Sequence, residues 1–313
     1  MMARGRIVCA TDFTARSDLA LSRAVLLAQQ TGARLTLVHA LNQRRSERLA
    51  RVHANRAYVQ LLSKIDQSFG PAASAIDIAV RAGNPLDVIA RVALEANADL
   101  VVLAAPQQRR SDAIFGTTAE RLLRAIKRPV LVVHREAQRS YRRVAMAVDL
   151  SNSSLPMIQM ATRLGVLQDA ETTLLHAMSP PHEGMLKTVG VAPEAVDDYR
   201  QGWLDDARLR LNAMLTAAEM DVERTRIQVR TETPAAAIGQ VLKQEFPELL
   251  TIGASRWLLI KRLLIGSVTD SLLRTAMCDV LVIPQNSHLH VVKAVGISPV
   301  QRPPGEQIPA ARS

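Results

Sequence analysis

Short apolar runs alternate with longer segments of helical periodicity along the first half of the chain. From Asp18 to Gln30 apolar residues recur at helical spacing, and Gly32 then supplies a stop signal. The runs consist almost wholly of Val, Leu, Ile and Ala, which is typical of parallel strands covered on both faces. Strands are predicted at Ile7–Ala10, Arg34–Ala40, Ala75–Arg81, Asp99–Ala105 and Pro129–His134. Helices are predicted at Asp18–Gln30, Arg44–Phe69, Pro85–Asn97 and Thr117–Lys127.

The second half of the chain repeats these landmarks in the same order. Asp12 and Asp149 end similar apolar runs 137 positions apart, and His39 and His176 keep the same offset. The offset then grows to 150 for Gly116 and Gly266, so about a dozen residues are inserted in the second half. The insertion is expected to be a loop at Ser179–Ala195. Strands are predicted at Val144–Asp149, Thr172–Ala177, Arg226–Thr231, Leu249–Gly253 and Val280–Pro284.

Alternating strands and helices imply right-handed crossovers and a parallel sheet. Each half is therefore predicted to be an α/β domain, a doubly wound parallel sheet of five strands. We expect the first domain at residues 1–140, the second at residues 141–287, and a proline-containing tail at residues 288–313 that is largely disordered.

The net charge of +10 lies wholly in the first half. Residues 1–140 contain 21 Lys or Arg and 11 Asp or Glu, whereas residues 141–313 contain 18 of each. Arg44, Arg48 and Arg51 would share one face of a helix. This face is either simply solvated or the docking site of an acidic partner. No nucleic-acid-binding motif accompanies the charge, so nucleic acid is not predicted, and a protein partner is favoured.

Other residue types exclude several classes of function. No apolar stretch approaches the roughly 20 residues of a membrane span, and no secretory signal is present, which predicts a cytoplasmic protein without a membrane role. Cys9 and Cys278 are interpreted as buried small hydrophobic residues. His39 and His176 are interpreted as hydrogen-bonded structural residues. No catalytic residue set and no metal site are predicted.

A candidate ligand site lies where strands 1 and 4 of each half end, because open parallel sheets bind ligands at this switch point. In the second half Asp149 and Gly253 end these strands, Arg256 follows, and Gly266 opens a helix whose N–H groups favour an anion. Ser267, Thr269 and Ala177 complete the candidate site. A capping box explains Ser267 and its counterpart Thr117 without a ligand, but it does not explain the glycines.

These motifs make the chain resemble a tandem universal stress protein over roughly residues 4–135 and 142–285. The resemblance rests on the strand ends Thr11-Asp12 and Val148-Asp149, on Leu-Val-His-Ala and Leu-Leu-His-Ala, on Gly83-Asn84-Pro85, and on Pro129–Val133. It implies a Rossmann-like fold of the adenine-nucleotide alpha hydrolase type. It also implies that the last strands, Val130–His134 and Leu281–Pro284, pair within the chain as an internal pseudo-dimer; a homo-oligomer is left open.

The nucleotide-binding members of that family carry G-x2-G-x9-G-[S/T] after strand 4. The second half matches it at Gly253 and at Gly266-Ser267, with Arg256 in place of the second glycine. The first half has Ala104 and Gln107 and a shorter spacing to Gly116-Thr117. The resemblance therefore implies a nucleotide site in the second half and a degenerate one, with Asp12, Gly116 and Thr117, in the first.

The resulting hypothesis is a stress-response protein that binds ATP or a related adenine nucleotide in its second domain, with Mg²⁺ only as the nucleotide's companion. It would act by binding or signalling rather than by catalysis, because no P-loop, nucleophile elbow or other enzyme signature is present. Two alternatives stay open. One is a nucleotide-independent interaction module that uses the basic first domain, and the other is a slow ATP hydrolase.

Overall fold

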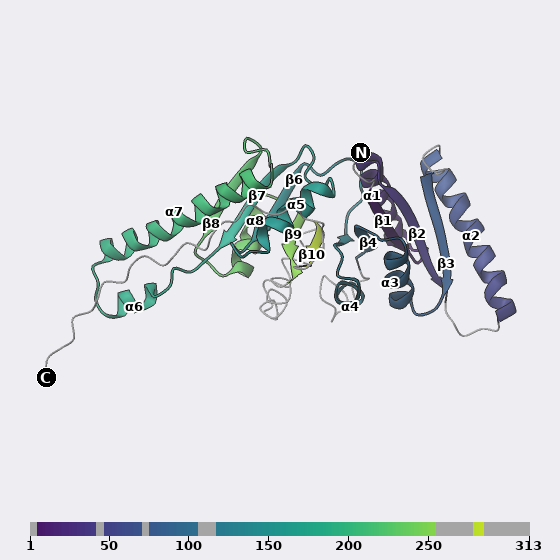
Figure 1. Cartoon of the computed structure of the whole chain (residues 1–313), viewed down its shortest axis with the longest axis horizontal. Coiled ribbons are helices and arrows are strands. Elements are labelled where there is room, and N and C mark those ends of the chain that lie inside the picture. The colour runs from purple at the N-terminus through teal and green to yellow at the C-terminus, as the bar shows by residue number, and fades with distance from the viewer. Residues whose placement is uncertain (1–4, 42–46, 71–74, 106–116, 255–277, 285–313) are drawn as a thin grey trace.

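The computed structural model describes residues 5–41, 47–70, 75–105, 117–254 and 278–284. Its ten strands form one sheet in the order β3-β2-β1-β4-β5-β10-β9-β6-β7-β8. The molecule is elongated along the direction in which the strands succeed one another, with α2 and α7 at its two ends (Figure 1). The described helices include none that is long and apolar enough to cross a membrane.

The first half has the predicted doubly wound arrangement. Its strands are β1 (Arg6–Thr11), β2 (Arg34–Leu41), β3 (Ile76–Ala82), β4 (Leu100–Ala104) and β5 (Val130–Val133). They are parallel, and β1 lies between β2 and β4, where the strand order reverses. The connecting helices are α1 (Ala15–Thr31), α2 (Glu47–Phe69), α3 (Pro85–Glu95) and α4 (Thr117–Ile126).

The second half has the same strand order, and it runs in the opposite direction along the sheet, so that the last strands of the two halves are neighbours. Its strands are β6 (Arg143–Val148), β7 (Glu171–Ala177), β8 (Thr225–Arg230), β9 (Leu249–Gly253) and β10 (Asp279–Ile283). Its helices are α5 (Ser154–Arg163), α6 (Glu183–Thr188), α7 (Pro193–Ala217) and α8 (Pro234–Gln244). The predicted α/β class and the parallel pairing within each half are confirmed.

The expectation of a loop at Ser179–Ala195 is wrong, because this segment contains α6 and the start of α7. Glu183 holds α6 in place: its carboxylate binds Lys187 within α6 at 2.8 Å and Arg200 of α7 at 2.6 Å. The prolines and glycines of the insertion indicated a loop. The i,i+4 pair of Glu183 and Lys187 was a local helix signal that this expectation overlooked, whereas the contact with Arg200 joins residues 17 positions apart.

The two halves meet through an antiparallel ladder between β5 and β10. Val280, Leu281 and Val282 lie opposite Val132, Leu131 and Val130. The strand pairing that the resemblance implied is therefore confirmed. It leaves β5 and β10 with neighbours on both sides, so neither is an open sheet edge.

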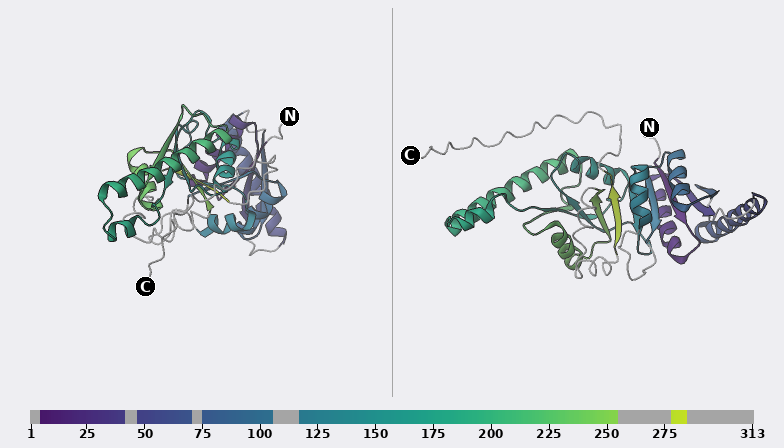
Figure 2. Two further views of the ribbon diagram at one scale, coloured as in Figure 1. Left: turned by 60° about the vertical axis from the view of Figure 1, so that its left-hand side comes forward. Right: turned by 90° about the horizontal axis from the view of Figure 1, so that it is seen from below.

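A hydrophobic core covers each face of the sheet and extends through both halves. On one face, Leu27 and Ile65 of the first half belong to the same cluster as Ile158 and Leu211 of the second. On the other face, α3 and α4 share a cluster with α8. Figure 2 shows how these helices flank the sheet and how α7 extends beyond it.

A buried charged cluster fastens the junction between the halves. Asp279, at the start of β10, is fully buried, and its Oδ1 accepts the backbone N–H groups of His134 (2.8 Å) and Arg135 (3.2 Å). Its Oδ2 accepts the Tyr141 hydroxyl at 2.7 Å and lies 3.3 Å from Nε of Arg23 on α1. Burial, followed by the Asp279 charge, raises the pKa of Tyr141 well above its ordinary value.

Candidate functional site

The carboxyl ends of β1, β2 and β4 enclose a cleft of about 470 Å³ in the first half. Asp12, Thr14, Arg16 and Ser17 line it from β1 and the start of α1. Its further lining includes Val38, His39 and Ala40, Pro85 and Ile89, and Ala104 and Ala105. The cleft therefore lies at the switch point where the sequence places its candidate site, in the copy predicted to be degenerate.

Asp12 holds the turn at the end of β1. Its Oδ1 accepts the backbone N–H of Thr14 at 3.0 Å and the Thr14 hydroxyl at 2.6 Å. Partial burial raises the pKa of Asp12, but the hydrogen bonds from Thr14 and Ser17 outweigh it, so the net pKa is lowered. Phe13, which lies between Asp12 and Thr14, adopts a left-handed backbone conformation with φ of 67°. Such a conformation in a non-glycine residue is strained and is often found at functional sites.

Asp149 builds the same turn at the end of β6. Its Oδ1 accepts the Ser151 backbone N–H (3.1 Å), the Ser151 hydroxyl (2.5 Å) and the Ser154 hydroxyl (2.8 Å). Leu150 repeats the left-handed conformation, with φ of 58°. Both copies thus have a strained turn that presents a carboxylate at the carboxyl end of the first strand of the domain.

The sequence signal for this turn is D-x-[ST]-x-x-S, which occurs at Asp12–Ser17 and again at Asp149–Ser154. The aspartates stand out in the sequence as strand ends, whereas the hydroxyl residues that bind them do not. Comparison of the two copies position by position would have found Thr14, Ser17, Ser151 and Ser154.

The histidines that end the apolar runs are hydrogen-bonded, as predicted. Nδ1 of His39 lies 2.8 Å from the carbonyl oxygen of Thr11, and Nδ1 of His176 lies 3.0 Å from that of Val148. Each bond ties the second strand of its half to the end of the first. Ala177 follows His176 at the end of β7, so it lies beside the Asp149 turn.

Gly253 ends β9 at the position that Ala104 occupies at the end of β4. A Cβ atom at Gly253 would meet only the sulfur of Met157, at an ordinary contact distance of 3.6 Å, and the residue does not adopt a left-handed conformation. The described packing therefore gives no reason for glycine here, whereas close approach of a ligand to the backbone would.

The other residues of the phosphate-loop prediction lie outside the described residues. These are Arg256, Gly266, Ser267, Thr269 and Gly116. Thr117 begins α4, but its side chain is not described. Of the predicted arginine face, Arg44 and the side chain of Arg48 are likewise outside, and Arg51 is exposed on α2.

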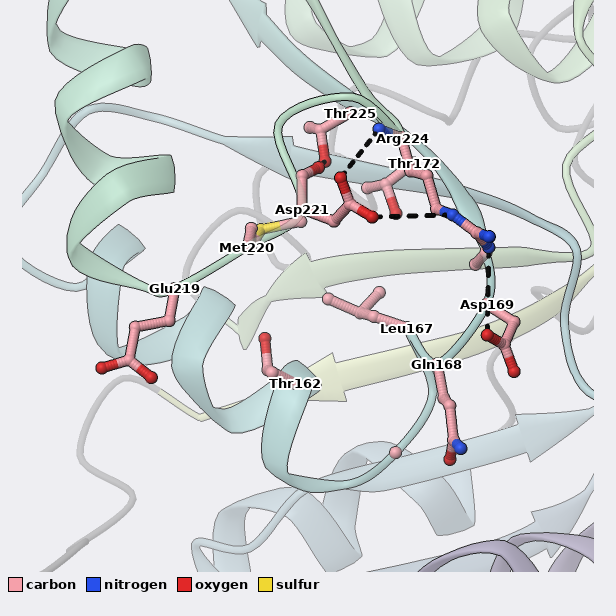
Figure 3. A pocket seen from close by; sticks show the side chains of 12 residues that line it. Thr162, Leu167, Gln168, Asp169, Thr172, Glu219, Met220, Asp221, Arg224 and Thr225 are labelled. Carbon is pink, nitrogen blue, oxygen red and sulfur yellow. Dashed lines mark hydrogen bonds and ion pairs between the residues drawn. The ribbon is translucent and has the colours of Figure 1, made fainter.

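Another hollow, of about 490 Å³, lies in the second half at the amino ends of the strands, where β7 and β8 begin (Figure 3). Arg224 bridges Asp221 (3.5 Å) and Asp169 (3.9 Å) across it. Ligands of open α/β sheets bind at the carboxyl ends of the strands, so this hollow is not the predicted site.

The turn, the strand order and the cleft can now be compared with known proteins. The family model for the universal stress protein family matches the chain twice, at residues 3–134 and 140–284. This chain belongs to the universal stress protein family. The universal stress protein A homolog 2 of Coxiella burnetii is 26% identical over 147 residues, which is 46% of this chain and 95% of that protein.

Two solved structures resemble the chain over most of its length. A universal stress protein from Archaeoglobus fulgidus, 16% identical, covers 89% of this chain and 96% of its own with a TM-score of 0.61. A putative universal stress protein from Pseudomonas aeruginosa, also 16% identical, covers 90% and 94% with a TM-score of 0.58. At this identity the likeness supports the tandem fold of the two universal stress protein domains.

The two universal stress protein domains share a fold but have different side chains at equivalent positions of the candidate site. The first has Arg16 in its cleft where the second has Ser153, and it has Ala104 where the second has Gly253. Among the described residues no group of three or more His, Cys, Asp or Glu side chains could hold a metal ion. The described part of each site contains a carboxylate and hydroxyl groups, and the first site also contains Arg16.

Proposed function

We propose that the second universal stress protein domain binds ATP or a related adenine nucleotide at the carboxyl ends of β6, β7 and β9. The observation that carries the proposal is Gly253: among the residues that the structure describes, neither packing nor backbone conformation requires a glycine there. A ligand lying against the end of β9 supplies the missing reason, because a methyl group would hold it away from the backbone.

Different residues of the proposed site are suited to bind different parts of the nucleotide. Asp149 can accept hydrogen bonds from ribose hydroxyls or base amino groups, since a carboxylate is an acceptor. The Gly266-Ser267 segment, at the expected start of a helix, can present N–H groups to phosphates, and Arg256 adds a positive charge. Mg²⁺ would enter only with the phosphates.

The protein acts in this proposal as a binding module rather than as an enzyme. Oδ1 of Asp149 already accepts three hydrogen bonds from Ser151 and Ser154. The lone pairs that these bonds leave free can accept hydrogen bonds from a ligand, which suits Asp149 to position a bound molecule.

The test is a matched pair of substitutions, followed by calorimetric titration with ATP. Gly253→Ala should fold normally, because within the described part of the chain its Cβ meets only Met157 at an ordinary distance. It should weaken ATP binding about tenfold or more through displacement of the ligand. The control is Ala104→Gly in the first domain, which should leave the affinity unchanged. Unaltered binding in Gly253→Ala would contradict the proposed site.

A further inference from the structure

The outer face of α2 carries apolar side chains in solvent. Val52 is 60% exposed, Val59 is 59% exposed, and Leu49 and Leu62 are each 50% exposed. The opposite face of the helix is packed, with Ala57, Leu61 and Ile65 buried against β2 and β3. Large apolar residues thus occupy both faces of a helix that needs only one for the fold.

The exposed residues follow a coiled-coil spacing. Val52, Asn55, Val59 and Leu62, which we call the α2 seam, are separated by three, four and three positions. This is the spacing of the a and d positions at which one helix packs against another. A helix lying along the α2 seam would cover three apolar side chains and one amide.

Unpaired positive charge flanks the α2 seam. Arg51 and Arg56 are both exposed, and within the described part of the chain neither forms an ion pair. They lie directly before Val52 and directly after Asn55, at the positions that face a partner's charges in a coiled coil.

The equivalent helix of the second domain, α7, lacks this combination. Its charges are neutralised within the helix, Arg208 by Asp205 at 2.7 Å and Arg200 by Asp197 at 2.7 Å. Its most exposed apolar residue, Leu209 at 70%, is next to Arg208 and Arg210, and the residues three and four positions away are Asp, Asn or the small Ala213. The α2 seam is therefore not a general property of this helix position.

We propose that the α2 seam docks an acidic amphipathic helix of a partner protein. The apolar positions would bury the partner's apolar stripe, and Arg51 and Arg56 would face its carboxylates. A second copy of this chain is disfavoured, because residues 1–140 carry a net charge of +10 and a twofold contact would oppose like charges. The α2 seam lies at one end of the molecule, whereas β6, which leads into the Asp149 turn, lies in the other half (Figure 1), so a helix docked on the α2 seam would not cover that turn.

The direct test measures fluorescence anisotropy with two synthetic helical peptides, each three heptads long. Both have Leu at a and d; one has Glu at e and g, and the other has Lys. The full chain should bind the Glu peptide and not the Lys peptide. Val59→Asp should weaken Glu-peptide binding about tenfold or more, because it places a like charge and a polar group in the interface. Leu209→Asp on α7 is the matched control and should leave the affinity unchanged.

Charge reversal gives a second, independent readout. The double variant Arg51→Glu and Arg56→Glu should lose the Glu peptide and gain the Lys peptide, and unchanged far-ultraviolet circular dichroism would show that it folds. Equal binding of both peptides by the full chain, or equal effects of Val59→Asp and Leu209→Asp, would overturn the proposal. So would a homodimer in analytical ultracentrifugation that Val59→Asp dissociates, because the occupant would then be a second copy.

Discussion

At the scale of the residue, Asp279 shows how a single buried carboxylate can join two domains. It accepts hydrogen bonds from the end of β5 and from Tyr141, and it pairs with Arg23 on α1. Arg23 also lies 3.9 Å from the centre of the Tyr141 ring and donates to the carbonyl of Arg139 at 2.8 Å. Removing one member leaves the others buried without their partner.

We therefore predict that Asp279→Ala lowers the free energy of unfolding by about 3–5 kcal/mol, because the Arg23 charge is left uncompensated. Urea denaturation followed by circular dichroism would measure the loss. Asp205→Ala, which breaks an exposed pair with Arg208, should cost less than about 1 kcal/mol. Equal effects of the two substitutions would show that the cluster does not hold the junction.

At the scale of the element, α6 shows how a short helix depends on its ion pairs. None of its residues is buried, so packing contributes little to it. Hydrogen bonds from Arg200, and then from Lys187, lower the pKa of Glu183 to about 2. Since the folded pKa lies below the ordinary value of about 4.3, this contribution is present above that pH and is lost as the pH falls through about 2.

Glu183→Gln should consequently increase hydrogen exchange in α6 while the global unfolding transition stays where it is. Hydrogen exchange with mass spectrometry at neutral pH measures both quantities, since local openings are separated from global unfolding. The matched control is Glu194→Gln in the first turn of α7, outside this ion-pair network. Undiminished protection of α6 in Glu183→Gln would show that the ion pairs are dispensable.

At the scale of the whole molecule, the two domains behave as one packed unit. The β5–β10 ladder and the cores on both faces of the sheet are continuous across the junction. Gly165, in the turn after α5, has φ of 72°, and a Cβ atom there would overlap Cγ2 of Thr31 at the end of α1. The contact between Gly165 and Thr31 across the two domains thus depends on a glycine.

Gly165→Ala should therefore destabilise the entire chain by about 1–3 kcal/mol, through backbone strain and the clash with Thr31. Differential scanning calorimetry should still show one transition, shifted to lower temperature. Gly202→Ala, in the exposed interior of α7 with no atom near its Cβ, should instead stabilise the chain by about 0.5–1 kcal/mol. A split into two transitions, with only one moved by Gly165→Ala, would show that the domains unfold separately.

Much of this fold could be predicted from the sequence because the strands and helices follow from local patterns of apolar and polar residues. The apolar runs gave the strands, and the duplication of Asp12 at Asp149 gave the two copies and their switch points. The contacts of Asp279 could not be predicted, since Tyr141 is 138 positions away. In the sequence Asp279 looks only like a polar residue at the start of a strand. The hydroxyl groups that hold the Asp12 and Asp149 turns are local, at two and five positions after each aspartate, and the repeated D-x-[ST]-x-x-S pattern could have predicted them.

The central claim is that one of the two domains holds an adenine nucleotide. The most direct measurement is to denature the purified protein, quantify the nucleotide released, and titrate the emptied and refolded chain with ATP by calorimetry. The account predicts one site per chain that Gly266→Asp abolishes and Gly116→Asp leaves intact. No nucleotide released together with no heat at millimolar ATP, or equal loss from the two substitutions, would contradict it.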